Sequence, residues 1–248
     1  MIGIIKGDVR YTYLSQMLGD AVSSDSLKDF YNIDRLVLPL GGIHADYTIK
    51  QTELNLKDIL NVNRINAIYT GNANKELTEL CRERHIRLYE MLKDHAFVME
   101  NAELTAKGLI YYLHGGSREL SEYHILVLGY GNIGYYLCRL FKALGTEFGV
   151  YTENKLEEKY LRLEGYSKAE EINGQYDIII NTIPQNVKVN YPSLTGVRVV
   201  DVASPPYGFD IDEIMKYGIS YEIVSAIPSK FAPASAARII KKFLENHR

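Results

Sequence analysis

The sequence predicts an α/β fold in two lobes, each a parallel sheet covered by helices on both faces. Short apolar runs alternate with amphipathic stretches in two successive series, which is typical of parallel strands joined by helical crossovers. The second series opens with a glycine-rich motif, G-Y-G-N-I-G at residues 129–134, placed between an apolar run and a helical pattern. A chain of 248 residues is long enough for one large domain or two small ones.

The first lobe is expected to cover residues 1–98. Its strands are predicted at 2–5, 36–38, 67–70 and 86–89, and its helices at 9–18, 54–60 and 76–84. The first apolar run stops at Gly7-Asp8, the second at Pro39, and the third at Gly71-Asn72. Glycine, proline and asparagine favour turns, so each of these strands is expected to end there.

The second lobe is expected to cover residues 99–248. A helical pattern over 97–115, broken at Gly115-Gly116, is interpreted as the connection between the lobes. Strands are predicted at 125–128, 148–151, 177–181, 198–202 and 221–224, and helices at 133–144, 157–163 and 211–217. A closing helix over 233–245 begins at Pro233, where a missing N–H costs nothing. The second lobe is thus predicted to include both the linking helix and the closing helix.

Composition excludes several classes of protein. A formal net charge of -3 argues against a nucleic-acid binder, which usually carries a basic face. Cys81 and Cys138 lie far apart in the sequence, a spacing that suits neither a metal cluster nor a disulfide framework. The N-terminus lacks the apolar region of a signal peptide, and no apolar run reaches the roughly 18 residues of a membrane span. We therefore expect a cytoplasmic protein without a metal site or a membrane partner.

The glycine-rich motif predicts a dinucleotide site, because it directly follows a strand and directly opens a helix. Gly129 would allow the tight turn, Gly131 would let the backbone approach a pyrophosphate, and Gly134 would let helix and strand pack closely. The N–H groups of Asn132 and Ile133, at the positive end of the helix dipole, would face the phosphates. The alternative interpretation is a structural strand-to-helix corner.

An acid near the end of the next strand bears on the choice of cofactor. Glu153 lies about twenty residues past Gly134, where a dinucleotide-binding fold places the acid that binds the ribose hydroxyls. Thr152, beside it, is assigned to the same site. A carboxylate here would repel a 2′-phosphate and so favours NAD, although Lys155 and Lys159 are near enough to weaken that preference.

Polar turns follow the next two strands. Asn181, Thr182, Ile183 and Pro184 come after the isoleucine-rich strand, and Ala203-Ser204 come after the strand at 198–202. Ligands of open parallel sheets bind at the carboxyl ends of the strands, so we expect these turns to line the nicotinamide pocket. Loop capping is the alternative interpretation.

These motifs together resemble the family formed by the A subunit of dipicolinate synthase, found in endospore-forming bacteria. The resemblance is spread over Gly7-Asp8 with Arg10, Leu38-Pro39, Gly71–Asn74, Asn101–Gly108, Leu126–Gly134, Asn181–Pro184, Asp201–Ser204 and Ile227–Pro233. The last stretch is the most specific, because a Pro-x-Lys-x-Ala-Pro run before a final helix is not general among dinucleotide-binding folds.

The resemblance implies two Rossmann-like lobes with a cleft between them and a nicotinamide cofactor in the second. It implies that the chain works with a flavoprotein-like B subunit to form pyridine-2,6-dicarboxylate, and that it self-associates into a homo-oligomer. Members of the family often carry a basic residue near the position of Glu153, which suits NADP. The resemblance therefore implies NADP where Glu153 favours NAD, and both cofactors are considered. The chain is shorter than expected for the family between Arg10 and Leu60, and the family's His-Gly pair has no counterpart in Leu120–Tyr123.

A dicarboxylate substrate requires cationic and hydrogen-bonding partners. We expect Arg10 and Lys230 to bind the carboxylates from opposite lobes, and Asp8 to act as a base or to orient Arg10. Asp8 has an alternative role as the N-cap of the following helix. Further substrate contacts are assigned to four uncharged polar residues: Asn72, Asn74, Thr105 and Ser204.

Three functions remain open at this point. The first is an oxidoreductase subunit that forms dipicolinate. The second is another NAD(P)-dependent dehydrogenase of small carboxylic acids, ranked lower because the Arg, Glu, His set of 2-hydroxyacid dehydrogenases is not visible in the second lobe. The third is a non-enzymatic nucleotide-binding regulator, which would not need Arg10 and Lys230 as a dicarboxylate clamp.

Overall fold

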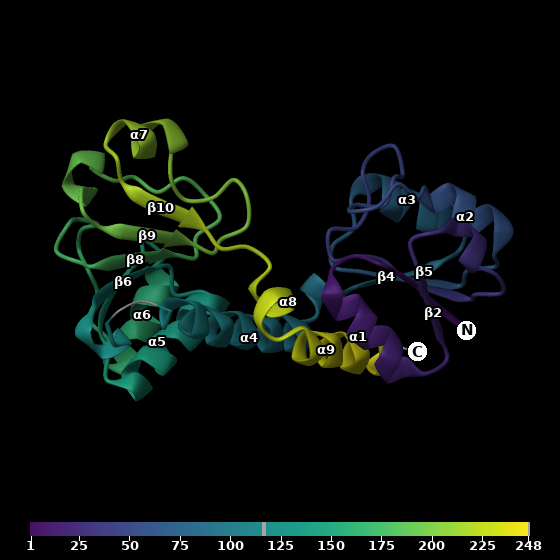
Figure 1. Cartoon of the computed structure of the whole chain (residues 1–248), viewed down its shortest axis with the longest axis horizontal. Helices are drawn as coiled ribbons and strands as arrows, with labels where there is room; N and C mark the ends of the chain where they lie inside the picture. Colours follow the sequence, from purple (N-terminus) through teal and green to yellow (C-terminus); the bar gives the residue numbers. More distant parts are fainter. Residues whose placement is uncertain (116–117, 248) are drawn as a thin grey trace. The chain divides into compact units, whose positions relative to one another are not determined.

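The computed structural model describes residues 1–115 and 118–247. The chain divides into two compact units, and their described residues are 1–101 with 228–247 in one and 102–115 with 118–227 in the other. Each unit contains a five-stranded sheet in which all strand pairs are parallel (Figure 1). The predicted α/β class with two parallel sheets is therefore confirmed. Part of the predicted helix break, Gly116, lies outside the described residues.

The first sheet has the strand order β2-β1-β3-β4-β5. Its strands are β1 (Ile2–Ile5), β2 (Ala21–Ser24), β3 (Arg35–Val37), β4 (Ala67–Thr70) and β5 (Arg87–Glu90). Its helices are α1 (Val9–Leu18), α2 (Leu56–Val62) and α3 (Lys75–Glu83), with short 3-10 turns η1 (Leu27–Asp29) and η2 (Met91–Lys93). Because the order reverses at β1, the carboxyl ends of β1 and β3 flank a topological switch point, where ligands of such sheets bind.

Alternation along the strands divides the apolar side chains of this unit between two faces. Successive residues of a strand point to opposite sides, so Ile4 and Ile5 belong to different cores. The core under α2 and α3 contains Ile5, Leu36, Ile68, Leu56, Ile59 and Leu77. The core under α1 contains Ile4, Val37, Tyr69, Tyr11 and Leu14. Both faces of the sheet are thus covered, as a parallel sheet requires.

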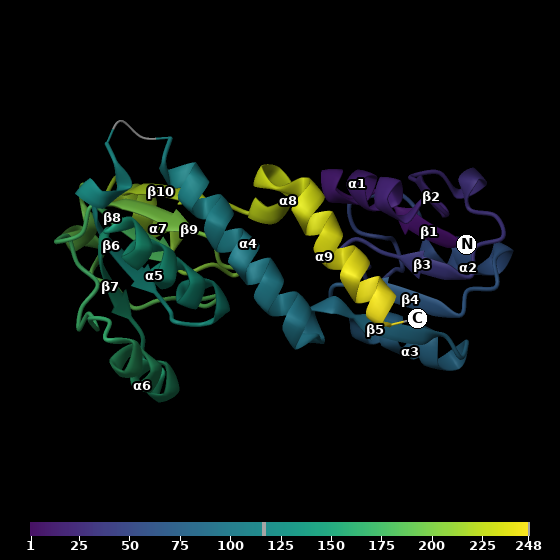
Figure 2. The same cartoon turned by 90° about the horizontal axis from the view of Figure 1, so that it is seen from below.

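The closing helix belongs to the first unit, so its predicted assignment to the second lobe is wrong. Helix α9 (Pro233–Asn246) follows the short helix α8 (Ile227–Phe231) and lies beside α1 in both views of the chain (Figures 1 and 2). Its apolar residues Ala237, Ile240, Phe243 and Leu244 complete the core that contains Ile4 and Tyr11. Helical periodicity reveals an apolar face, but it does not reveal which sheet that face will cover.

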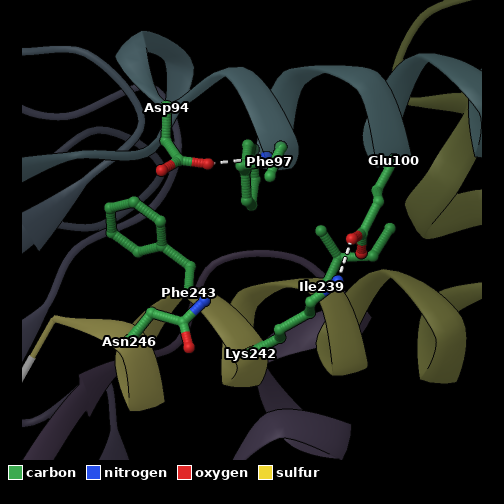
Figure 3. Close-up of a pocket in the computed structure, with 8 residues that line it drawn as sticks. Asp94, Phe97, Glu100, Ile239, Lys242, Phe243 and Asn246 are labelled. Atoms are coloured by element: carbon green, nitrogen blue, oxygen red, sulfur yellow. Dashed lines mark hydrogen bonds and ion pairs between the residues drawn. The ribbon is translucent and has the colours of Figure 1, made fainter.

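Helix α9 also packs against the first turns of α4 (His95–Leu113), within the first unit (Figure 3). The rings of Phe97 and Phe243 meet edge to face with centroids 5.9 Å apart, and Lys242 forms an ion pair with Glu100. The gap that remains between the helices measures about 10 Å³, which is about the space of one water molecule. It is therefore too small for a substrate or cofactor.

The second sheet has the strand order β10-β9-β8-β6-β7. Its strands are β6 (His124–Leu128), β7 (Glu147–Tyr151), β8 (Ile178–Asn181), β9 (Arg198–Asp201) and β10 (Ser220–Ile223). Its helices are α5 (Asn132–Leu144), α6 (Lys155–Glu164) and α7 (Ile211–Lys216), with 3-10 turns η3 (Leu120–Glu122) and η4 (Tyr191–Leu194). Ile214 of α7 packs on one face of this sheet, in a core with Leu126, Ile179 and Val199. The order reverses at β6, which brings the turns after β6 and β8 to the switch point.

Neither a membrane-spanning helix nor a metal-binding cluster is found among the described residues. No helix among them is both long enough and apolar enough to span a membrane. No three of their His, Cys, Asp and Glu side chains are grouped so that they could bind a metal ion.

Both cysteines are predicted to be unreactive in the folded protein. Cys81 and Cys138 are free and buried, and burial raises the pKa of the Cys81 thiol to about 11 and that of Cys138 further. Since burial disfavours the thiolate, which is the reactive form, a disulfide reagent at pH 8 should label neither residue in native protein and both after urea unfolding. Rapid labelling of the native chain would contradict this placement.

Candidate functional site

The turn between β6 and α5 requires glycine at two of its three motif positions. Gly129 has a φ of 88°, and a Cβ there would lie 2.8 Å from Thr182 Oγ1. A Cβ on Gly134 would lie 2.2 Å from the Gly129 carbonyl oxygen, closer than atoms can approach. The turn and the start of α5 are therefore packed too tightly for side chains at these positions, in agreement with the roles predicted for the two glycines.

Gly131 differs from the other two because the space in front of it is open. It is exposed, and the nearest atom to a Cβ built on it is Glu157 Oε1, at 4.0 Å. Gly131 is also the N-cap residue of α5 and supplies no side chain to cap the first N–H groups of the helix. Asn132 is exposed and Ile133 half-buried at the same helix start. This 13-residue helix thus presents its positive end to open space, as anion binding at a helix N-terminus requires.

The turn after β8 is attached directly to the glycine turn. The Thr182 amide and hydroxyl both donate to the Leu128 carbonyl oxygen, at 3.0 and 2.8 Å. Ile183 is half-buried beside Gly129, whereas Pro184 is exposed. The turns that follow the two central strands therefore form one continuous edge at the switch point, where the sequence predicts cofactor contacts.

A buried polar network lies behind this edge. Asn181 and Asp201 are fully buried at the ends of β8 and β9. Asp201 accepts hydrogen bonds from Asn181 Nδ2 at 3.0 Å, the Ala203 amide at 3.0 Å, the Gly208 amide at 2.8 Å and the Tyr221 hydroxyl at 3.1 Å. Burial and the Asp201 carboxylate raise the pKa of Tyr221, so its hydroxyl stays protonated as a donor.

This network holds the loops in place and uses both N–H donors of the Asn181 side chain. The Asn181 amide oxygen accepts from the Ile183 amide at 3.0 Å, and its nitrogen also donates to the Ile183 carbonyl at 3.0 Å. Asn181 was predicted to contact the cofactor, but the structure places its side chain in the interior. Ala203 is also buried, and Ser204 is exposed in the following loop.

A cavity of about 190 Å³ opens beside the glycine turn. Four residues predicted for the cofactor line it: Gly129, Thr152, Glu153 and Ile183. Six others line it without having been predicted: Tyr151, Asn154, Glu157, Gln185, Asn186 and Val187. Because β7, β6 and β8 are adjacent in the sheet, the ends of these three strands enclose the cavity on one edge.

Glu157 is the most informative residue that the sequence reasoning missed. Its Oε2 accepts a hydrogen bond from the Tyr130 amide at 2.8 Å and another from the Thr152 hydroxyl at 2.6 Å. Glu153, the acid identified by spacing, is exposed and accepts only the Tyr151 hydroxyl, at 2.9 Å, among the contacts of the described residues. The signal available in the sequence was an acid in the first turn of the helix after the second strand, rather than at the end of the strand.

In the first unit, Asp8 and Arg10 form a pair at the carboxyl end of β1. Asp8 is the N-cap of α1 and accepts the Arg10 amide at 3.1 Å. Arg10 Nε also donates to both Asp8 oxygens, at 2.8 and 3.0 Å. Asp8 thus has the capping role and also orients Arg10. Arg10 is 6% exposed, so it is not an ordinary surface arginine, and its other side-chain N–H donors are on the two Nη atoms.

The remaining predicted substrate residues are distributed over both units. Asn74 caps α3 by accepting the Leu77 amide at 3.0 Å and donates to the Ile43 carbonyl at 3.3 Å, which makes it structural. Asn72 is exposed after β4. Thr105 is buried in α4 within the second unit.

Lys230 lies in helix α8, and it is exposed. It belongs to the same unit as Arg10, so the expectation that the two cations come from opposite lobes is wrong. The physical reason is the packing of α9 on α1, which brings the chain from Pro228 onward back to the first unit.

Comparison with known proteins agrees with this architecture. The family model "D-isomer specific 2-hydroxyacid dehydrogenase, NAD binding domain" matches residues 71–191, a range that includes the glycine turn and the cavity. The A subunit of dipicolinate synthase from Bacillus subtilis (strain 168) is 24% identical over 238 residues, which cover 87% of this chain and 77% of the relative.

Two solved structures show the shared fold over nearly the whole chain. The A subunit of dipicolinate synthase from Bacillus halodurans matches with a TM-score of 0.82 at 22% identity and covers 99% of this chain and 96% of its own. The pyruvate reductase of Chlamydomonas reinhardtii matches with a TM-score of 0.67 at 14% identity and covers 99% and 95%. Both structural matches concern the fold alone.

Proposed function

We propose that this chain is an NAD(P)-dependent oxidoreductase subunit that forms dipicolinate, as a diverged relative of the dipicolinate synthase A subunits, one of which is 24% identical to it. The match to an NAD-binding domain implies a dinucleotide cofactor. The observation that carries the proposal is the open Gly131 at the start of α5, beside a cavity of about 190 Å³ on the same edge of the sheet. A pyrophosphate would bind at the uncapped helix start, and the adjoining nucleoside would enter the cavity.

The proposed reaction converts a dihydro-ring carrying two carboxylates to the aromatic pyridine-2,6-dicarboxylate. When bound, an oxidised nicotinamide would accept the hydride at its C4 atom, and the proton lost from the ring would pass to a base. In the first unit, Arg10 and Lys230 would bind the two carboxylates, and Asp8 would hold Arg10 through Nε. Asn72, which is exposed after β4 in the same unit, would add a neutral hydrogen bond.

The partners proposed for this chain follow from its relatives. Dipicolinate synthase is named by its subunits, which implies a second chain. We propose a flavoprotein-like B subunit, together with self-association and a cytoplasmic location. A second candidate function is another NAD(P)-dependent dehydrogenase of small carboxylic acids. The observation that favours it is the match of residues 71–191 to the 2-hydroxyacid dehydrogenase domain.

The two functions are separated by calorimetry with NAD, NADH, NADP and NADPH, each with and without dipicolinate. Dinucleotide binding that strengthens in the presence of dipicolinate supports the synthase proposal. Dinucleotide binding without a response to dipicolinate supports the second candidate. If no dinucleotide binds, both proposals fail.

Replacing Arg10 is predicted to remove the response to dipicolinate and to leave dinucleotide binding unchanged. The lost charge-assisted hydrogen bonds should weaken dipicolinate binding by about tenfold or more in Arg10→Ala. Arg87→Ala, an exposed arginine of the same unit, is the matched control. An Arg10→Ala protein that still responds to dipicolinate like the wild type would rule Arg10 out as a carboxylate partner.

A further inference from the structure

The cavity beside the glycine turn has the position of an adenosine subsite. It lies between the residues that follow β7 and those that follow β8, with Gly129 between them at the end of β6. A dinucleotide whose pyrophosphate lies at the start of α5 would continue along this edge through its ribose. Whichever carboxylate faces the ribose therefore decides between a 2′-hydroxyl and a 2′-phosphate.

Glu157 lines this cavity and is held there by hydrogen bonds. Asn154 caps α6 by accepting the amides of Leu156 at 2.9 Å and Glu157 at 3.4 Å, which fixes the backbone of the first turn. The Glu157 carboxylate is then anchored through Oε2 by the Tyr130 amide and the Thr152 hydroxyl. A group with two donors on one oxygen has little freedom to rotate away.

The other oxygen of Glu157 lies beside the glycine turn, at the border between the cavity and the space in front of Gly131. Oε1 is the nearest atom to a Cβ built on Gly131, at 4.0 Å, across the space left open in front of the turn. An ionised carboxylate has about four lone-pair sites, so the two bonds on Oε2 leave acceptor capacity for a pair of neighbouring hydroxyls.

We propose that Glu157, and not Glu153, binds the ribose hydroxyls of the dinucleotide and makes this chain prefer NAD to NADP. The inference rests on the proposed dinucleotide site. Glu153 also lines the cavity, but within the described part of the chain its carboxylate contacts the Tyr151 hydroxyl and is not tied to the glycine turn. Among the described residues that line the cavity, none is a lysine or arginine that would neutralise a 2′-phosphate. Among these lining residues, the 2′-phosphate of NADP would face the carboxylates of Glu153 and Glu157 without a lysine or arginine to neutralise it.

The test is the ratio of the NADP to the NAD dissociation constant, measured by calorimetry on the full chain and on four glutamate variants. The wild type is expected to bind NAD about thirtyfold more tightly than NADP or better. Glu157→Gln should lower the ratio of the NADP to the NAD dissociation constant about tenfold, because it weakens NAD binding and removes the repulsion of the 2′-phosphate of NADP. Glu153→Gln should change the ratio by less than about threefold. Glu158→Gln, on the same helix but outside the cavity lining, should leave both constants unchanged.

An aspartate at position 157 distinguishes the effect of the negative charge from the effect of side-chain length. Glu157→Asp keeps the negative charge but withdraws it by one methylene, so NAD binding should weaken without any gain in NADP binding. Thermal unfolding of each variant monitors the fold. The inference is overturned if Glu153→Gln, rather than Glu157→Gln, narrows the ratio, or if the wild type binds NADP as tightly as NAD. If the wild type binds neither dinucleotide, the proposed function itself fails.

Discussion

A Gly131→Val substitution is expected to abolish dinucleotide binding while the second unit stays folded. The valine side chain would point into open space, since the nearest atom to the added Cβ is 4.0 Å away, and its methyl groups would fill the place of the pyrophosphate. The affinity should fall by at least about a hundredfold, equivalent to ~2.8 kcal/mol or more. Calorimetry with NAD measures the loss, and far-UV circular dichroism measures the fold.

Gly134→Ala is the contrasting change in the same motif. A methyl group there would lie 2.2 Å from the Gly129 carbonyl oxygen, so the backbone of the turn must move and the second unit should lose stability. Gly131 and Gly134 are thus expected to separate into a binding position and a packing position. A Gly131→Val protein that binds NAD with wild-type affinity would show that the pyrophosphate does not pass over this turn.

An Asp201→Ala substitution is expected to destabilise the second unit more than any surface change. It removes the acceptor of four hydrogen bonds and leaves the amides of Ala203 and Gly208 and the side chains of Asn181 and Tyr221 without that acceptor in the interior. Each orphaned buried donor costs about 1–3 kcal/mol, so the free energy of unfolding should fall by about 4 kcal/mol or more. Urea unfolding followed by circular dichroism measures this.

The control for Asp201 is Glu171→Ala, which removes an exposed carboxylate from the same unit. Its free energy of unfolding should stay within about 0.5 kcal/mol of the wild type. Because the chain has two units, the transition of the second one must be resolved before the values are compared. Equal stability of Asp201→Ala and the wild type would mean that the buried network contributes nothing to the fold.

Most of the secondary structure could be predicted because the strands are apolar and bounded by turn residues. The strand at 67–70 and the helix at 9–18 have the predicted limits. β2 was missed because A-V-S-S has little apolar character, and its strand conformation comes from pairing with β1. The short helix α8 was missed because Pro228 at its second position looks like a loop signal.

Placement in space was harder to predict than local structure. The apolar face of α9 was visible, but its attachment to α1 depends on contacts between residues distant in sequence. The same limit applies to the site. The glycine turn is a local motif and was found, whereas Glu157 reaches Tyr130 and Thr152 through the geometry of α6, which a spacing rule based on the strand end does not contain.

The return of the chain to its first unit has a consequence for biosynthesis. A ribosome releases residues 1–101 first, yet Ala237, Ile240, Phe243 and Leu244 complete the core around Ile4 and Tyr11 only when the last helix emerges. The second unit, which is continuous from Ala102 to Ile227, has all of its strands available earlier. During translation the first unit must therefore wait with one sheet face covered by α1 alone, and it can finish folding only after the second unit has been synthesised.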